Sequence, residues 1–541
     1  MAAANSSGAS SNAPLPLDGR VALVTGGSRG IGREVCSHLA ALGARVVVNY
    51  ASNSAKADEL VAELATRGGH RAVAVRADVS DPDDVRALFD RAEEAFGSPP
   101  HIVVTCAGVL DANYPALADT TVADFDAMFA VNVRGTFLVC REAANRVPAR
   151  SGGRIVTFSS SIVGTLLPGY AAYTATNAAV EAMTRILAKE VAAKGITANV
   201  VAPGPVRTEL FLAGKDEEFL KKVAEQSMGR IAETTDVAPV VAFLASDAAG
   251  WVNGQVIRQN SRTDEKQTSE ARTDDGKQSS SIAMAASTAA ALPLEGRVAI
   301  VTGGSRGIGR EVSSHLSALG ARVVVNYASN PAKADELVAE LASRGHRAVA
   351  VKADVSDPDA VRVLFDHAEE AFGSPPRIVV TCAGILDSKY PKLADTAVED
   401  FDAMFAVNTR GKFLVCREAA NRIPANTGGR IVTFSSTLVA TLVPGYAAYA
   451  ASNAAVEAMT RILAKEVAAK GITANVVAPG PVRTELFLAG KDEATLRRME
   501  QSSVGGRIAE TTDIAPAVGF LVSDAAAWVN GQVVRVNGGI A

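Results

Sequence analysis

Cysteine, histidine and aromatic residues are scarce in this sequence. Its 541 residues include five cysteines and six histidines, and aromatic side chains make up 5% of the chain. The cysteines form no Cys-x-x-Cys pair, and no histidine cluster lies near them in the sequence, so we expect neither a disulfide framework nor a metal site. The thiols are instead expected to be buried in a protein of a reducing compartment.

A surplus of positive charge and long apolar runs are also missing. The formal net charge is −4 and no run of basic residues is present, so a nucleic-acid partner is not expected. No apolar stretch approaches the ~20 residues that span a membrane. Residues 1–16 lack arginine and an apolar core, which predicts a disordered tail on a cytoplasmic protein, with a plastid leader as the alternative.

The chain contains a long internal duplication. Residues 17–258 resemble residues 294–541 along nearly their whole length, and each copy has the size of one α/β domain. Residues 259–293 between them are polar and aperiodic, which predicts a flexible linker. Met284 begins a stretch similar to the start of the chain. An alternative is therefore that two neighbouring coding units have been joined.

Apolar β-type runs alternate with amphipathic segments of helix length in each copy. The strands predicted in the first copy are 21–24, 45–49, 72–77, 102–105, 155–159, 197–201 and 255–258. The predicted helices are 32–42, 56–67, 81–96, 121–146, 173–194 and 235–244. Strands that are apolar throughout and separated by helices indicate a parallel sheet covered on both faces. The predicted fold class is therefore α/β, a doubly wound, Rossmann-like parallel sheet in two tandem copies.

A glycine-rich turn follows the first strand of each copy. It reads Thr-Gly-Gly-Ser-Arg-Gly-Ile-Gly at residues 25–32 and again at residues 302–309. Such a turn between a buried strand and a helix binds phosphate, because glycines admit the pyrophosphate and the helix N-terminus offers N–H groups. The alternative is a turn that only packs, and the recurrence of the motif in both copies weighs against it.

Together with this turn, three further motifs resemble the short-chain dehydrogenase/reductase family, and within it plant NADPH-dependent aldehyde reductase-like proteins. Residues 105–108, Thr-Cys-Ala-Gly, partly match the family's Asn-Asn-Ala-Gly run. A serine precedes a tyrosine by the usual family separation, and a Pro-Gly turn follows at residues 203–204. The resemblance covers both copies nearly end to end. It implies hydride transfer between a nicotinamide cofactor and a small carbonyl substrate.

The resemblance implies a catalytic serine and tyrosine in each copy. They are Ser160 and Tyr173 in the first copy and Ser436 and Tyr449 in the second. A tyrosine on a rigid helix donates the proton, and the serine polarises the carbonyl oxygen. Serines flank Ser160 on both sides, so this assignment stays open by one position. A second tyrosine precedes each helix and is expected to line the substrate mouth or to pack.

Asparagines mark two further positions of the family pattern. Asn132 and Asn408 match the asparagine that supports a proton-relay water, and the alternative is an amide that kinks the helix. The family's lysine, four residues after the tyrosine, is replaced here by Asn177 and Asn453. Lysine lowers the phenol pKa by about 1–3 units, so we expect this phenol to titrate nearer its free value of about 10. Slowed reduction is the expected result, and a nucleotide-binding pseudoenzyme is the alternative.

The end of the second strand predicts NADPH over NADH. NAD-selective sheets carry an acidic residue there, whereas residues 49–53 read Asn-Tyr-Ala-Ser-Asn and Arg29 lies in the glycine turn. Amide, hydroxyl and guanidinium donors suit a 2′-phosphate, and the alternative is an ordinary polar turn. Asp78 and Asp354 match the family's adenine-contacting aspartate, although each is also a candidate cap for the following helix.

The residues expected to bind NADPH or NADP⁺ come from several strand ends. In the first copy they are Gly26, Ser28, Arg29, Gly30, Ile31, Gly32, Asn49, Tyr50, Ser52, Asp78, Val79, Asn177, Pro203, Gly204 and Thr208. In the second copy they are Gly303, Ser305, Arg306, Gly307, Ile308, Gly309, Asn326, Tyr327, Ser329, Asp354, Val355, Asn453, Pro479, Gly480 and Thr484. The resemblance implies that residues 209–234 form the substrate lid. Their apolar side chains suit a hydrophobic carbonyl substrate, and the alternative is that they only pack. Helix 173–194 has small residues that suit packing on a like helix, within the chain or in a homo-oligomer.

Overall fold

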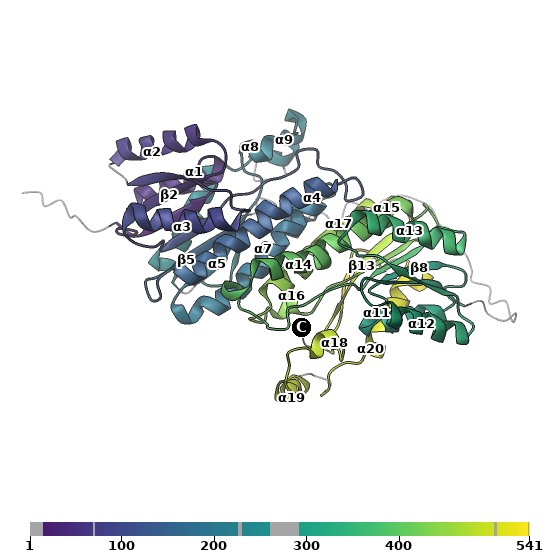
Figure 1. Ribbon diagram of the computed structural model, residues 1–541. Helices are drawn as coiled ribbons and strands as arrows, with labels where there is room; N and C mark the ends of the chain where they lie inside the picture. The colour runs from purple at the N-terminus through teal and green to yellow at the C-terminus, as the bar shows by residue number, and fades with distance from the viewer. Residues whose placement is uncertain are drawn as a thin grey trace, which may run out of the picture.

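The chain folds into two α/β units of the same topology (Figure 1). The computed structural model describes residues 15–68, 71–225, 230–250, 252–259, 292–502, 506–527, 529–538 and 540. Nearly all of the expected tail and most of the expected linker lie outside these residues. Within the described part of the chain, no helix is both long enough and apolar enough to cross a membrane.

Each unit is built on a seven-stranded parallel sheet. The first sheet has the order β3-β2-β1-β4-β5-β6-β7, and the second has the order β10-β9-β8-β11-β12-β13-β14. The strands of the first are β1 (Val21–Thr25), β2 (Arg45–Tyr50), β3 (Ala72–Arg76), β4 (Ile102–Thr105), β5 (Arg154–Phe158), β6 (Thr197–Pro203) and β7 (Val256–Gln259). Those of the second are β8 (Val298–Thr302), β9 (Arg322–Tyr327), β10 (Ala348–Lys352), β11 (Ile378–Thr381), β12 (Arg430–Phe434), β13 (Thr473–Pro479) and β14 (Val533–Val536). The order reverses between β1 and β4, so the doubly wound fold predicted from the sequence is confirmed.

Helices cover both faces of each sheet. In the first unit they are α1 (Gly30–Ala41), α2 (Ser54–Gly68), α3 (Pro82–Phe96), α4 (Val122–Phe129), α5 (Thr136–Arg146), α6 (Ile162–Thr165), α7 (Ala171–Val191), α8 (Glu209–Leu212), α9 (Glu217–Glu225) and α10 (Thr234–Ala245). In the second they are α11 (Gly307–Ala318), α12 (Pro331–Ser343), α13 (Pro358–Phe372), α14 (Val398–Phe405), α15 (Lys412–Arg422), α16 (Leu438–Thr441), α17 (Ala447–Glu466), α18 (Glu485–Leu488), α19 (Glu493–Ser502) and α20 (Thr511–Val522). In the first unit, α1, α2 and α10 bury one face of the sheet. The other face is buried by α3, α4, α5 and α7.

Several predicted helices begin up to two residues late, and two of the predicted helices differ in helix type as well. The single helix expected over 121–146 is divided, because a π-helical turn at Ala130–Gly135 separates α4 from α5. The helix expected from Tyr173 begins at Ala171 instead, and its last residues form a 3₁₀ turn at Ala192–Lys194. The π turn contains Asn132, whose side chain is bound to another loop, and such turns often mark functional positions.

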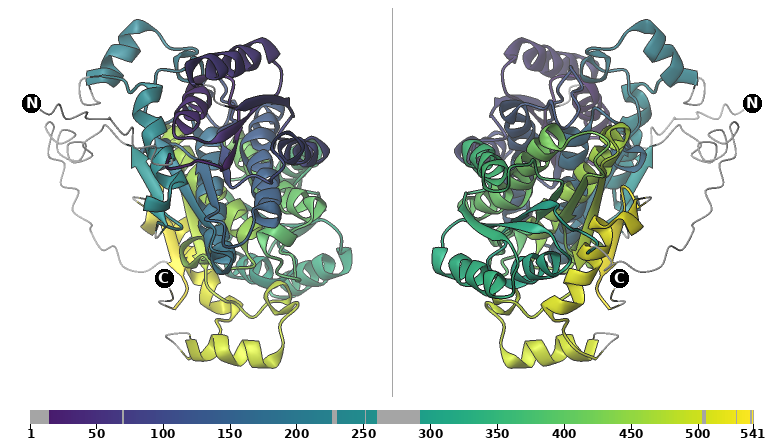
Figure 2. Two further views of the ribbon diagram at one scale, coloured as in Figure 1. Left: turned by 90° about the vertical axis from the view of Figure 1, so that its left-hand side faces the viewer. Right: turned by 90° about the vertical axis from the view of Figure 1, so that its right-hand side faces the viewer.

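The two units pack against each other through α7 and α17, which lie side by side between the sheets (Figure 1). Phe125 stacks on Phe413 with ring centroids 4.1 Å apart, and two reciprocal ion pairs flank the contact, Arg134–Asp402 and Arg410–Asp126. The apolar core of the facing layers is continuous across both units. Figure 2 shows α9, in teal, and α19, in yellow-green, at opposite ends of the molecule.

Candidate active site

The glycine-rich turn packs too closely against other backbone for side chains at Gly26 and Gly32. Gly26 has a φ of +60°, and a Cβ there would lie 2.9 Å from the Cα of Ala107. A Cβ on Gly32 would lie 2.3 Å from the carbonyl oxygen of Gly26. Arg29 is the N-cap residue of α1 and makes no side-chain capping bond. The turn therefore brings backbone and a helix N-terminus together as a phosphate site requires.

A cavity of about 470 Å³ lies at this turn in the first unit, within the size range of cofactor sites. Twelve residues predicted to bind the cofactor line it: Gly26, Ser28, Arg29, Gly30, Ile31, Gly32, Asn49, Tyr50, Ser52, Asp78, Val79 and Thr208. Three others predicted for this copy, Asn177, Pro203 and Gly204, are not among its lining residues. The cavity thus gathers five strand ends that are distant in the sequence.

The Asn49 side chain does not act as the sequence predicted. It is 1% exposed, and its amide nitrogen donates to the carbonyl oxygens of Val75 and Ala77 at 3.3 and 3.0 Å. Its amide oxygen accepts from the backbone N–H of Gly26 at 3.3 Å. Asn326 repeats these contacts in the second copy. The expected phosphate contact through this amide is therefore corrected, because the amide joins β2, β3 and the glycine turn.

A lysine that the sequence analysis missed lies near the predicted 2′-phosphate site. Lys56, in the first turn of α2, donates to Glu209 at 2.6 Å, and Glu209 also lies 3.5 Å from Arg29. The hydrogen bond from Lys56 lowers the pKa of the Glu209 carboxyl below its ordinary value. In the second unit Glu485 is shared in the same way by Lys333 and Arg306. Two cations are thus held at the edge of the cavity by one lid carboxylate.

Asp78 is not the cap of the helix that follows it. Its carboxylate accepts from the backbone N–H and the hydroxyl of Ser80 at 2.9 and 2.8 Å. The cap of α3 is Asp81, which accepts from two first-turn N–H groups. The sequence left open whether Asp78 contacts the adenine or caps α3. Asp81 is the cap, and Asp78 lines the cavity.

The three consecutive serines at the end of β5 have different surroundings. Ser159 is buried and donates to Glu181 at 2.9 Å. Ser160 accepts from the N–H of Ile162 at 3.3 Å. In the second unit, burial raises the pKa of Tyr449, and a hydrogen bond from Ser436 to its phenol opposes this rise. This pairing favours the middle serine as the one that acts with the tyrosine.

Burial controls the titration of the two tyrosines predicted to be catalytic. It raises the pKa of Tyr173 above its ordinary value, and a hydrogen bond with the Asn177 side chain opposes this effect. Burial likewise raises the pKa of Tyr449, which Asn453 and Ser436 oppose. The sequence predicts a phenol pKa near 10, because it shows the loss of the lysine but not the burial of the ring. Desolvation of the phenolate adds a further increase, so each phenol is protonated at neutral pH.

The asparagines that replace the lysine bind the helix on which they stand. Asn177 donates to the carbonyl oxygen of Tyr173 at 2.8 Å, and Asn453 donates to that of Tyr449 at 2.9 Å. They are 7% and 2% exposed. Their amides therefore supply hydrogen bonds but no positive charge beside the phenol.

The second unit has a buried lysine where the first has Thr136. Lys412 is 4% exposed and donates to the carbonyl oxygen of Phe434 at 2.6 Å, at the end of β12. Burial lowers its pKa to about 8. This lysine was not predicted as a site residue, although a lysine on an otherwise apolar helix face is a detectable signal in the sequence. The two units therefore differ in charge beneath their sites.

Asn132 holds the loop that follows β4. Its amide oxygen accepts from the N–H of Val109 at 2.8 Å, and its amide nitrogen donates to Val109 O at 2.9 Å and Thr176 Oγ1 at 3.2 Å. Asn408 makes the matching contacts in the second unit. These bonds give the asparagine a structural role, which is to join this loop to the π-helical turn and to α7. The proton-relay role stays a prediction.

Aromatic rings and a lysine, not identified as a group from the sequence, form the lid contact. Lys215 bonds the hydroxyl of Tyr114 and lies 4.0 Å from the centroid of that ring. It also lies 4.7 Å from the ring centroid of Phe211, and Tyr114 packs against Tyr170 at 4.9 Å. Burial lowers the pKa of Lys215 to about 8. The region between lid and tyrosine helix is thus aromatic with one cation.

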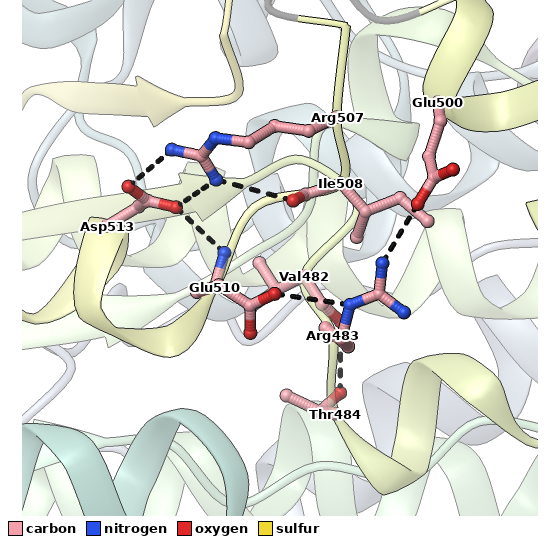
Figure 3. A network of polar contacts seen from close by, with 8 residues as sticks. All are labelled: Val482, Arg483, Thr484, Glu500, Arg507, Ile508, Glu510 and Asp513. Atoms are coloured by element: carbon pink, nitrogen blue, oxygen red, sulfur yellow. Dashed lines mark hydrogen bonds and ion pairs between the residues drawn. The ribbon is translucent and has the colours of Figure 1, made fainter.

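In the second unit, hydrogen bonds between charged side chains link α19, the counterpart of the lid helix α9, to the turn that carries Thr484 (Figure 3). Arg483 donates to Glu510 at 3.1 Å and to Glu500, on α19, at 2.8 Å. The Thr484 hydroxyl donates to Val482 O at 3.3 Å and caps α18. The lid helix and the cofactor-side turn are therefore held together.

Comparisons with known proteins match both units. The family described as "Enoyl-(Acyl carrier protein) reductase" matches residues 26–261 and 303–541. The chain is 52% identical over 257 residues to "NADPH-dependent aldehyde reductase-like protein, chloroplastic" from Arabidopsis thaliana, covering 46% of this chain and 95% of that protein. It is 53% identical over 252 residues to "Short-chain type dehydrogenase/reductase" from Picea abies, covering 46% of this chain and 93% of that protein. A solved dehydrogenase/reductase from Sinorhizobium meliloti 1021 is 34% identical, with a TM-score of 0.43, and covers 46% of this chain and 96% of that chain.

Each alignment spans nearly all of the relative but only about half of this chain, as a tandem duplication requires. Both units contain the parallel sheet, the glycine-rich turn and the serine–tyrosine pattern. The chain therefore belongs to the short-chain dehydrogenase/reductase family of nicotinamide-dependent oxidoreductases, and it contains two copies of the family's domain in tandem.

Proposed function

We propose that this chain is an NADPH-dependent reductase that converts aldehydes or ketones to alcohols. The observation that carries the proposal is the cavity at the glycine-rich turn, with Arg29 among its lining residues and Lys56 joined to it through Glu209. The strand end that carries an acid in NAD-selective sheets has none here. A 2′-phosphate suits these two cations because it accepts charge-assisted hydrogen bonds.

The protonation state of the phenol suits it to act as a proton donor. When bound, the cofactor supplies the hydride that reduces the carbonyl carbon. Tyr173 gives its proton to the developing alkoxide oxygen, Ser160 donates a hydrogen bond to the same oxygen, and solvent then reprotonates the phenolate. A raised phenol pKa keeps Tyr173 protonated at neutral pH. It therefore favours proton donation over the proton removal that alcohol oxidation requires.

Loss of the lysine is proposed to slow this step. Neither Asn177 nor Asn453 carries charge to stabilise the phenolate that forms as the proton leaves. The missing charge corresponds to about 1.4–4 kcal/mol in phenol ionisation. We therefore propose a reductase of reduced rate that acts on apolar or aromatic carbonyl compounds, as the rings of Tyr114, Tyr170 and Phe211 suit.

Oxidation of NADPH with a panel of aldehydes, ketones and quinones tests the proposal. We expect turnover in the native chain and none in the Tyr173→Phe/Tyr449→Phe double variant, with NADPH affinity unchanged. Turnover that survives in the double variant would exclude the tyrosines as proton donors. Preference for NADH over NADPH would contradict the cofactor assignment.

A second candidate is a pseudoenzyme that binds NADPH as a sensor or assembly partner. The buried, uncharged Asn177 and Asn453 favour it. NADPH binding without turnover, together with turnover in Asn177→Lys/Asn453→Lys, would select this candidate. Turnover by the native chain would reject it.

The compartment belongs to the same proposal. The sequence predicts the cytoplasm with a plastid as the alternative, and the Arabidopsis relative is named as chloroplastic. Imaging a carboxyl-terminal fluorescent fusion in plant cells distinguishes the two.

A further inference from the structure

The long helix of the second unit ends on a loop of the first. Glu466, the last residue of α17, accepts from the backbone N–H groups of Leu117 and Gly169 at 2.8 and 3.0 Å. The preceding residue, Lys465, donates to the carbonyl oxygen of Leu166 at 2.7 Å. One lysine–glutamate pair therefore binds both ends of the segment 166–169 across the unit interface.

The first unit returns the same contacts to the second. Glu190 accepts from the N–H groups of Leu393 and Gly445 at 2.8 and 3.0 Å. Lys189 donates to the carbonyl oxygen of Leu442 at 2.7 Å. The contact is thus formed twice, by different side chains, with equal geometry.

The loop that is held leads directly into the catalytic helix. Segment 166–169 precedes Tyr170, the N-cap residue of α7, and Tyr173 stands in the first turn. Leu166 has a φ of +51° and Gly169 a φ of +80°, so the loop has an uncommon backbone conformation that outside contacts must maintain. A shift of this loop therefore moves the start of the helix that carries the proton donor.

The same loop also supports the lid. A Cβ on Gly169 would lie 2.7 Å from the carbonyl oxygen of Tyr114, which shows how closely the two loops pack. Tyr114 has a φ of +50°, its hydroxyl donates to Ala213 O at 2.6 Å, and Lys215 bonds that hydroxyl. A continuous set of contacts thus runs from Glu466 through Gly169 and Tyr114 to the lid of the opposite unit.

The carboxylates are suited to this task because they are partly removed from water. Burial raises the pKa of Glu466, and the hydrogen bonds from Gly169 and Leu117 oppose this rise. Glu190 has the same balance with Gly445 and Leu393. Hydrogen bonds to a carboxylate are stronger than neutral ones, and removing an acceptor leaves the backbone donors unpaired.

We infer that each active site is completed by the opposite unit. Glu466 and Lys465 are positioning residues for the site of Tyr173, and Glu190 and Lys189 are positioning residues for the site of Tyr449. They hold the substrate loop and, through it, the lid. The expected change in KM rests on the proposed reductase function, whereas the expected change in the position of the loop does not.

Variants that keep only one active site show whether a glutamate affects the site of the opposite unit or the site of its own unit. Tyr449→Phe leaves only the first site, and Tyr173→Phe leaves only the second. In the first background we expect Glu466→Gln to raise the KM for the carbonyl substrate about tenfold, with NADPH affinity unchanged, and Glu190→Gln to have no effect. In the second background the two glutamates exchange roles. Loss caused by the glutamate of the same unit, or equal loss from both, would overturn the inference.

Hydrogen–deuterium exchange of the full chain tests the contact without turnover. We expect Glu466→Gln to speed exchange of the Gly169 amide at least tenfold and to leave the Gly445 amide unchanged, and Glu190→Gln to do the reverse. If Glu466→Gln fails to fold, Lys465→Met removes the contacts with Leu166 and Thr165 and leaves those of Glu466. This variant is expected to speed exchange in the same segment. Unchanged exchange of the opposite loop would refute the inference. If exchange responds but no carbonyl is reduced, only the proposed function fails.

Discussion

The replacement of the family's lysine by asparagine predicts an unusual pH dependence of carbonyl reduction. The side chain of Asn177 is already a hydrogen-bond partner of the Tyr173 phenol. An ammonium placed there by Asn177→Lys therefore lies within the ~4–6 Å over which an opposite charge stabilises an ionised group. We expect the phenol pKa to fall by about 1–3 units, which corresponds to about 1.4–4 kcal/mol in favour of the phenolate.

The sign follows from the role of the phenol as proton donor. Burial raises its pKa in the native chain, so the protonated form, and with it the rate of reduction, should persist to a pH above ~10. In Asn177→Lys/Asn453→Lys the rate should decline at a pH lower by about 1–3 units. At neutral pH the variant should be faster, because the phenolate left by proton transfer is stabilised.

The assay is the pH profile of kcat for one aldehyde at saturating NADPH, in native and variant chains. Thermal unfolding at each pH serves as the control for stability. A native rate that declines below pH ~9, or a variant with the same midpoint as the native chain, would refute the reasoning, because desolvation would then not govern the phenol.

Three further predictions concern the cofactor site and the fold. Gly32→Ala should abolish NADPH binding at the first site, because its Cβ would lie 2.3 Å from Gly26 O. Gly164→Ala is the matched control, because its Cβ meets nothing within 4 Å. The number of NADPH molecules bound per chain, measured by calorimetry, should fall only for Gly32→Ala. The double variant Lys56→Met/Lys333→Met should raise the KM for NADPH about fivefold, since each exposed cation contributes about 1 kcal/mol to an ion pair. The KM for NADH should stay unchanged. Equal changes for both cofactors would contradict a contact with the 2′-phosphate. Lys412 has its folded pKa lowered to about 8 from 10.5, so its contribution to stability should rise by up to about 3 kcal/mol between pH 8 and 10.5. Lys412→Thr, the residue of the first copy, should lack this rise in denaturant titrations, and an unchanged pH slope would exclude the buried charge.

Local sequence was enough for the sheet, the duplication and the glycine-rich turn. Apolar strands and amphipathic helices are encoded by side-chain periodicity, and glycine at positions 26 and 32 is required by close backbone approach. Because parallel strands end at the same edge of a sheet, twelve of the residues predicted from the sequence to bind the cofactor line one cavity. These features depend on neighbours in the chain or on a general rule of the fold.

The tertiary structure decided what the sequence order does not encode. The side chain of Asn49 is occupied by β3, Lys56 reaches a lid carboxylate 153 residues away, and Glu466 binds an N–H group 297 residues away. Burial raises the tyrosine pKa beyond the increase that the loss of the lysine alone predicts. Desolvation and contacts between distant segments exist only once the sheets and helices have packed. In the sequence, the small residues on one helix are the only indication that the two units pair. The contacts that this pairing gives to each active site are visible only in the folded chain.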